Sequence, residues 1–363
     1  MLARSGLQRS LGKRCAVEPP RQSSGNDEIE ADPLDGTDAP NPNTTINIWR
    51  INTNGTGLMP LTTVTALNAD AIEPQWSPDG MFLVFESGRK LDGSDAAGPN
   101  NTRNIWRVNA DATGLRLVTN VTAANADAFE PQWSPDSSKI AFSSRRKLDG
   151  TDAASPNLIF NIWRVNADGT GLMPLTTTTA PGTSSGTPRW SPDSTKILFY
   201  SSRAIDGTDA RNLNGTDNIW QVNADGTGVR LVTNNTALYA NNYGGDWSPD
   251  GTKIVFESSR KLDGSDMANA NNILNIWRVN LDGTGLTPLT RGTAVGTGSM
   301  DPRWSPDGTK VVFSSTRKLD GTDAPNLNMA ENIWRVNADG TGLMPLTSTT
   351  ASPAGSQWPS FGP

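Results

Sequence analysis

Six stretches of the chain carry two aspartates and an asparagine at fixed spacing, as Asp-Gly-Thr/Ser-Asp followed by Asn five residues later. Calcium in proteins takes about 6–8 oxygen ligands from carboxylates and carbonyls, and the glycine would let both carboxylates converge on one ion. The alternative is that these residues form Asx turns without a metal. The pattern therefore predicts either Ca2+ sites or structural turns. The residues are Asp35, Asp38, Asn43, Asp92, Asp95, Asn100, Asp149, Asp152, Asn157, Asp206, Asp209, Asn214, Asp263, Asp266, Asn271, Asp320, Asp323 and Asn328.

Carboxylates also precede a recurring Trp-Ser-Pro-Asp motif. The chain has no histidine, which excludes Ser-His-Asp catalysis and imidazole metal ligands. A pair of carboxylates can still hydrolyse glycosides. Glu73 and Glu130 stand before Pro-Gln-Trp in successive copies, and Asp246 and Asp301 hold comparable places in later copies. We expect these residues at a channel rim, where they either contact a ligand or form a solvated acidic edge.

Two of the three tyrosines, Tyr239 and Tyr243, fall in one segment that differs strongly from its counterparts elsewhere in the chain. The copies of the repeat are otherwise nearly identical, so a difference says more than a shared residue. We therefore expect Tyr239 and Tyr243 to belong to a ligand-binding surface.

The elements that must position these residues repeat with a fixed period. Asn-Ile-Trp begins at residues 47, 104, 161, 218, 275 and 332, in steps of 57, and Trp-Ser-Pro-Asp recurs with the same step. All twelve tryptophans belong to these two series if the degenerate motif Gln-Trp-Pro-Ser-Phe at Trp358 is included. Such a period indicates a solenoid, a propeller or an array, with tryptophan as a core element.

Each repeat predicts four short strands, two tight turns and two longer loops. The second strand, such as Ile-Val-Phe after Lys253, is apolar without alternation and is therefore covered on both faces. We expect an all-β fold, a six-bladed β-propeller of four-stranded antiparallel blades. The tight turns share one face, and the long loops share the other with the segments that join blades.

The chain begins and ends inside a blade. We expect residues 1–27 to be a disordered tail and residues 28–363 to form the propeller. A clasp between the N- and C-terminal segments would then complete the last blade and remove free sheet edges. The stretch Asn26–Ala31 is a poor strand by composition, so the clasp blade has either three strands or four.

The repeats resemble those of the TolB-type propeller family. The resemblance rests on the motifs from Pro74, Pro131, Pro188 and Pro302, on the Ile-x-Phe strands and on the six Asn-Ile-Trp strands. It implies a propeller fold and an extracytoplasmic location, periplasmic or secreted. The domain that precedes the propeller in TolB, and any hydrolase domain, have no counterpart here, so no functional residue is carried over.

Composition narrows the classes of partner. A net charge of −6 argues against nucleic acid, and no apolar run approaches the ~18 residues that a spanning helix needs. The single cysteine excludes an intrachain disulfide, and the N-terminus shows no signal peptide as written.

These observations predict a non-enzymatic, monomeric binding scaffold that recognises a protein or glycan partner through the long-loop face. A glycan-active hydrolase or lyase using the rim carboxylates is the alternative. A purely structural repeat module is the second alternative.

Overall fold

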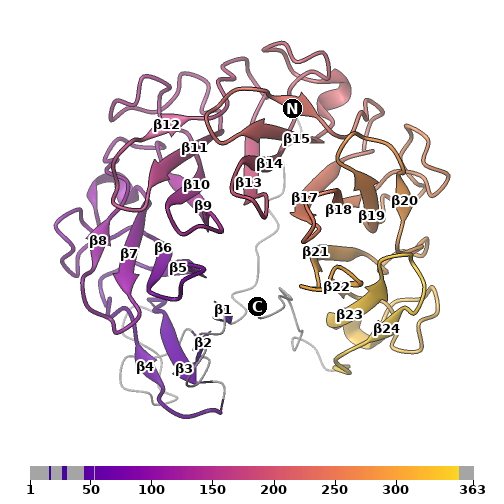
Figure 1. Cartoon of the computed structure of the whole chain (residues 1–363), viewed down its shortest axis with the longest axis horizontal. Helices are drawn as coiled ribbons and strands as arrows, with labels where there is room; N and C mark the ends of the chain where they lie inside the picture. Colours follow the sequence, from indigo (N-terminus) through magenta and orange to yellow (C-terminus); the bar gives the residue numbers. More distant parts are fainter. Residues whose placement is uncertain (1–15, 18–26, 31–44, 53, 351–363) are drawn as a thin grey trace.

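The computed structural model describes residues 16–17, 27–30, 45–52 and 54–350. Six four-stranded antiparallel sheets are arranged round a central axis, as the sequence predicted (Figure 1). We number these sheets as blades 1 to 6 in chain order. In blades 2 to 6 the first strand lies nearest the axis and the fourth lies at the rim.

Each blade is a meander in which consecutive strands pair. The strands are β1 (Ala16–Val17), β2 (Asp27–Glu30), β3 (Trp49–Asn52) and β4 (Met59–Pro60) in blade 1; β5 (Ala71–Trp76), β6 (Phe82–Ser87), β7 (Asn104–Asn109) and β8 (Arg116–Leu117) in blade 2; β9 (Ala128–Trp133), β10 (Lys139–Ser144), β11 (Asn161–Asn166) and β12 (Met173–Pro174) in blade 3; β13 (Ser185–Trp190), β14 (Lys196–Ser201), β15 (Asn218–Asn223) and β16 (Arg230–Leu231) in blade 4; β17 (Asn242–Trp247), β18 (Lys253–Ser258), β19 (Asn275–Asn280) and β20 (Thr287–Pro288) in blade 5; and β21 (Ser299–Trp304), β22 (Lys310–Ser315), β23 (Asn332–Asn337) and β24 (Met344–Pro345) in blade 6. Short 3-10 turns lie at η2 (Pro99–Asn101), η3 (Leu213–Gly215) and η4 (Leu327–Met329).

Blade 1 differs from expectation in its inner strands. The poor strand does form, as β2, so this sheet has four strands and the three-stranded alternative is wrong. The strand beside β2 is β1, which comes from the segment expected to be a disordered tail. Residues 355–363 lie outside the described residues, so the clasp with the C-terminal segment stays a prediction.

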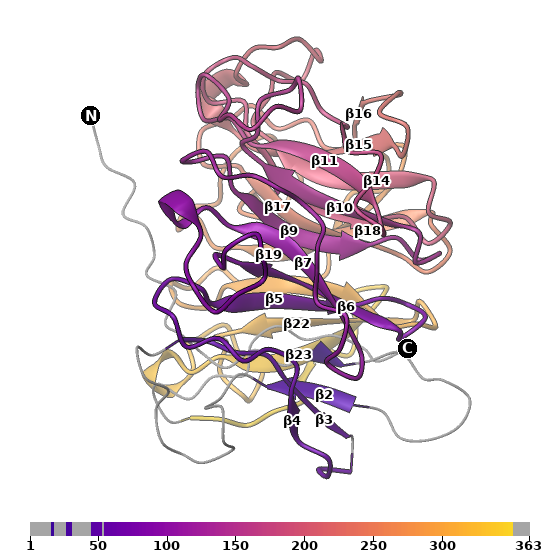
Figure 2. The same cartoon turned by 90° about the vertical axis from the view of Figure 1, so that its left-hand side faces the viewer.

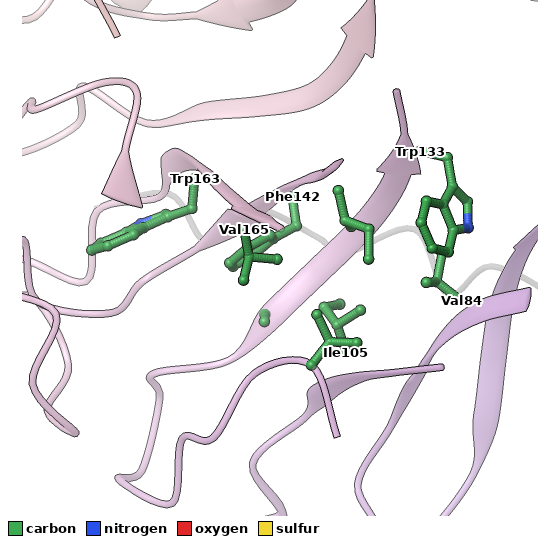
Figure 3. Packing of buried hydrophobic residues seen from close by; sticks show 9 residues of the cluster. Val84, Ile105, Trp133, Phe142, Trp163 and Val165 are labelled. Atoms are coloured by element: carbon green, nitrogen blue, oxygen red, sulfur yellow. The ribbon is translucent and has the colours of Figure 1, made fainter. Parts of the chain in front are cut away.

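The core lies between successive blades, because each buried apolar cluster of the described residues combines side chains of two neighbouring sheets. Val84 and Ile105 of blade 2 pack against a cluster of blade 3 that includes Phe142 and Trp163 (Figure 3). Phe142 and Trp163 are almost completely buried. Truncating a buried aromatic of this size costs about 3–5 kcal/mol, so the periodic tryptophans stabilise the fold rather than form a surface.

An arginine follows the second strand in each of blades 2 to 6, and it is buried in all of them except blade 4, where Arg203 is half-buried. Arg89 lies 5.7 Å from the ring centroid of Trp106, and Arg260 lies 5.8 Å from that of Trp277. Burial lowers the pKa of Arg260 to about 10, and the nearby Asp266 partly offsets this effect. These arginines therefore stack on the tryptophan of their own blade.

Candidate functional site: the long-loop face and the channel

The two ends of the strands carry different connections, which lie on opposite sides of the sheets (Figure 2). One end carries the Ser-Pro-Asp and Asp-Gly-Thr-Gly turns, and we call it the tight-turn face. The other end carries the loops between second and third strands, together with the segments that join blades. We call this end the long-loop face. Its loops are 88–103, 145–160, 202–217, 259–274 and 316–331, and its joining segments are 61–70, 118–127, 175–184, 232–241 and 289–298.

Hydrogen bonds tie these loops to the joining segments. The carboxylate of Asp152 accepts from the backbone N–H groups of Thr122 and Ala123, at 2.8 and 2.9 Å, and from the Thr122 hydroxyl. The Thr122 carbonyl accepts from the side-chain amide of Asn100, in the loop of the preceding blade, at 3.0 Å. We call this Asn–Thr–Asp connection the relay. It joins the loop of one blade to the loop of the next through the segment between them.

The relay recurs in each later blade. Its threonines are Thr122, Thr179, Thr236 and Thr293, its asparagines are Asn100, Asn157, Asn214 and Asn271, and its aspartates are Asp152, Asp209, Asp266 and Asp323. Asp95 binds Thr65 in the same way, and Asn328 donates to Thr350. Burial raises the pKa of Asp152, but the hydrogen bonds from Thr122 and Ala123 outweigh it, so this pKa lies below its usual range.

The first aspartate of each pair is used differently. Asp149 accepts from the N–H and hydroxyl of Thr151, at 3.0 and 2.6 Å, and pairs with Lys147 at 2.7 Å. The hydrogen bond from Lys147 and those from Thr151 hold the pKa of Asp149 well below its usual range. The equivalents Asp92, Asp206, Asp263 and Asp320 bind their own loops in the same way.

These contacts are those of the Asx-turn alternative, extended by the relay. The two carboxylates of one loop bind different parts of the chain. Among the described residues, no group of three or more His, Cys, Asp or Glu side chains is placed to hold a metal ion. Asp35, Asp38 and Asn43 lie outside the described residues. The calcium hypothesis stays a prediction.

The channel carboxylates belong to a second set of contacts between blades. Each first strand of blades 2 to 6 shifts register over the same two or three residues, and the residue there has a positive φ. These residues are Glu73, Glu130, Thr187, Gly244 and Asp301. The sequence did not reveal this bulge, because the five positions share no residue type.

At three of these bulges, Glu130, Thr187 and Asp301, a carboxylate of the preceding blade accepts the backbone N–H group. Glu86 accepts from the N–H of Glu130 at 2.7 Å, and Glu130 in turn accepts from the N–H of Thr187 at 2.8 Å and from the Ser143 hydroxyl at 3.0 Å. Glu257 accepts from the N–H of Asp301 at 3.0 Å. Glu130 thus links blade 3 to blade 4. The hydrogen bonds that make this link occupy the carboxylate that acid–base catalysis would need.

Asp246 lies two residues beyond the bulge and accepts from the N–H of Trp304 at 2.9 Å. Arg189 and Arg303 occupy the same position in the adjoining blades. Burial lowers the pKa of Arg189 to about 10, and repulsion from Arg303 contributes, whereas Asp246 among other carboxylates raises it. The channel position that Asp246 occupies is therefore mixed in charge rather than a purely acidic rim.

The two tyrosines predicted to share a surface are separated. The Tyr243 ring on β17 lies edge-on to Tyr200, with centroids 6.0 Å apart, and is half-buried. Tyr239, in the segment before β17, is 57% exposed. Only Tyr239 presents its side chain on the long-loop face.

Sequence reasoning missed most of the exposed apolar side chains. Fifteen large apolar residues are exposed in the described part of the chain, and ten of them lie on the long-loop face. Seven of the ten share only three repeat positions, but the residue types at these positions differ between copies, and that variation was the signal available in the sequence. The ten are Leu67, Leu158, Ile205, Leu213, Leu238, Tyr239, Met267, Val295, Leu327 and Met329.

The sequence and the fold of this chain resemble those of several known proteins. No family model matches the chain. An uncharacterized protein of Agrobacterium fabrum is 25% identical over 283 residues, which cover 66% of this chain and 83% of that protein. A structure from Agrobacterium tumefaciens assigned as TolB superposes with a TM-score of 0.53 at 21% identity, covering 90% of each chain. TolB from Acinetobacter baumannii gives a TM-score of 0.54 at 17% identity, covering 92% of this chain and 66% of that one.

The fold is that of a TolB-type β-propeller. The same fold occurs in an oligogalacturonate lyase from Vibrio parahaemolyticus, with a TM-score of 0.55 at 12% identity over 94% of this chain and 86% of that one. At these identities the likeness shows the fold alone. No helix in the described part of the TolB-type propeller is both long and apolar enough to cross a bilayer.

Proposed function

We propose that this TolB-type propeller is a binding module that recognises a protein partner through its long-loop face. The observation that carries the proposal is the gathering of ten of fifteen exposed large apolar side chains on that face. Exposed apolar side chains that gather on one surface are typical of interaction sites, whereas scattered ones need no explanation.

The relay supports a binding role because it fixes the loops before a partner arrives. Each loop is bonded to the segment before it through an aspartate and to the segment after it through an asparagine. A surface held in this way loses little conformational entropy on association, which favours affinity.

A glycan partner is the less favoured form of the proposal. All eleven tryptophans in the described residues are buried, so none of them offers a ring for stacking on a sugar. A glycan-active enzyme would need Glu130 as an acid or base, yet its carboxylate accepts two hydrogen bonds that join strands and blades. A purely structural module would have no reason to keep apolar side chains in water.

The likeness to TolB proteins supports an extracytoplasmic location, and we include this location and a monomeric state in the proposal. Photo-cross-linking of the full chain in an extract of the source cells tests the binding role. One variant replaces the ten apolar residues of the long-loop face by serine. The matched control replaces Leu58, Met81, Val229 and Met344, which are exposed at the tight-turn end.

The expected result is one cross-linked protein that wild type and control capture and that the ten-residue variant loses. Equal capture by all three would overturn the proposal. Turnover of a glycoside panel that Glu130→Gln abolishes would replace it with the enzymatic alternative.

A further inference from the structure

The exposed apolar residues are unevenly distributed round the long-loop face. Blades 4 to 6, with the segments that lead into blades 5 and 6, hold eight of the ten, whereas Leu67 and Leu158 lie elsewhere. We call these eight the apolar arc. They are Ile205, Leu213, Leu238, Tyr239, Met267, Val295, Leu327 and Met329.

Tyr239 occupies a backbone conformation that suits it poorly. Its φ is 65°, in the left-handed region, where a bulky side chain is disfavoured. The equivalent positions in the other copies carry residues that tolerate this region, namely Asn68, Asn125, Gly182 and Gly296. Tyr239 keeps this conformation although 57% of its surface is exposed, so burial offsets the strain only in part.

Met329 shows the same conflict at a second position. Its φ is 57°, and it is 51% exposed. Asn101, Gly215 and Asn272 hold the equivalent place in three other copies, and Leu158, outside the arc, shares the conflict with a φ of 52°. Its side chain lies over Gly296, where an added Cβ would stand 2.6 Å from the Met329 Cε. Bulky residues that keep a strained backbone conformation while about half of their surface stays exposed are typical of functional surfaces.

The charge of this region indicates what kind of surface fits it. Segment 232–241, which carries Leu238 and Tyr239, has no charged residue, and segment 289–298 has only Arg291. The three long loops of the arc, 202–217, 259–274 and 316–331, carry eight acidic and six basic residues. With Arg291 included, the two signs nearly cancel, so the arc selects neither a cationic nor an anionic partner.

We infer that the apolar arc binds an uncharged, apolar segment of the protein partner, with Tyr239 and Met329 as its main contacts. This inference rests on the proposed function and assigns the partner's chemistry and the specificity-determining residues. Replacement of either residue by asparagine, as found in other copies, should relieve backbone strain while it removes contact area.

The test uses a displayed library of random linear peptides selected on the full chain. The variant Tyr239→Asn/Met329→Asn is the probe. Met81→Asn is the matched control, because Met81 is exposed to the same extent as Met329, 51%, but lies on the tight-turn face. Unfolding temperatures of all three proteins show that each is folded.

The expected peptides are apolar and without net charge. The double variant binds them at least about tenfold more weakly, while its unfolding temperature is equal to or above that of wild type. Met81→Asn binds as wild type does. Affinity changes by less than about twofold between low and high salt, because no charge pair is involved.

Enriched peptides with net charge, equal binding to the double variant, or equal losses in Met81→Asn would each overturn the inference. The cross-linking experiment separates this failure from that of the proposed function. If the ten-residue variant loses its partner but the double variant keeps it, the face binds a partner outside Tyr239 and Met329. If both variants keep it, the proposed function fails.

Discussion

The third strand carries an asparagine at each end, and the two faces of the propeller use it differently. Asn161 begins β11 at the long-loop face, is fully buried, and binds the joining segment at Thr176 and Thr178. Asn166 ends β11 at the tight-turn face and binds Thr170 within its own turn. The asparagine at the tight-turn face therefore stabilises its own turn, whereas the one at the long-loop face binds residues 15 and 17 positions away.

This difference explains which positions vary between repeats. Contacts within a turn need nearly every residue of that turn, so Asp-Gly-Thr-Gly recurs with little change. The long loops are fixed by a few side chains at their bases, which leaves their tips free to differ. Variation thus gathers on the face that has the exposed apolar residues.

The largest difference between the faces is expected for the two asparagines. Asn161→Ala should lower the free energy of unfolding by about 2–3 kcal/mol, because the buried N–H of Thr178 and the Thr176 hydroxyl lose their acceptor. Asn166→Ala should cost less than about 1 kcal/mol, since water can replace its partner. Urea unfolding followed by tryptophan fluorescence measures both values, and equal losses would contradict the comparison.

The relay predicts a smaller difference inside one loop. Asp152→Ala should lower the free energy of unfolding by about 1–2 kcal/mol, because two backbone N–H groups and a hydroxyl lose their acceptor at a partly exposed site. Asp149→Ala should have a smaller effect, since Asp149 binds only its own turn and Lys147. A larger effect for Asp149 in the same urea experiment would mean that the relay does not hold the loops.

Acid should weaken the tight-turn face. The hydroxyl of Ser248 and the donors of Thr252 lower the pKa of Asp250 to about 2, and similar contacts give Asp193 and Asp307 the same value. Because the folded chain favours the carboxylate, this contribution is complete above about pH 4 and is lost as the pH falls toward about 2. Unfolding temperatures measured across this range should fall, and the fall should be shallower in Asp250→Asn. An equally steep fall in that variant would assign the acid sensitivity elsewhere.

Calcium should have the smallest effect. If the two aspartates of each long loop bound one ion, calcium at about 100 times its dissociation constant would stabilise the fold by about 2.7 kcal/mol. Because the carboxylates already bind different parts of the chain, melting curves in EDTA, calcium and magnesium should coincide. A rise with calcium alone, accompanied by heat on titration, would support the calcium hypothesis.

The sequence was enough for the repeat, the four strands of blades 2 to 6, the tryptophan core and the division into two faces. These follow from local patterns of apolar residues and turns, which recur in each copy. The bulges at Glu130 and Asp301 could not be predicted, because the N–H group at each of them binds a carboxylate supplied by the preceding blade. The partners of Asp152 were also hidden, since they lie 29 and 30 residues away along the chain.

The relay connects every pair of adjacent 57-residue units through the same three residue types. One unit could therefore replace another without loss of this connection. An unequal crossover between two copies in the gene would join two units that still share a complete relay. A whole blade could then be gained or lost without breaking a hydrogen bond of this kind, and ring closure alone would select the number of copies. The loop tips, which take no part in the relay, are where individual copies can diverge after such an event.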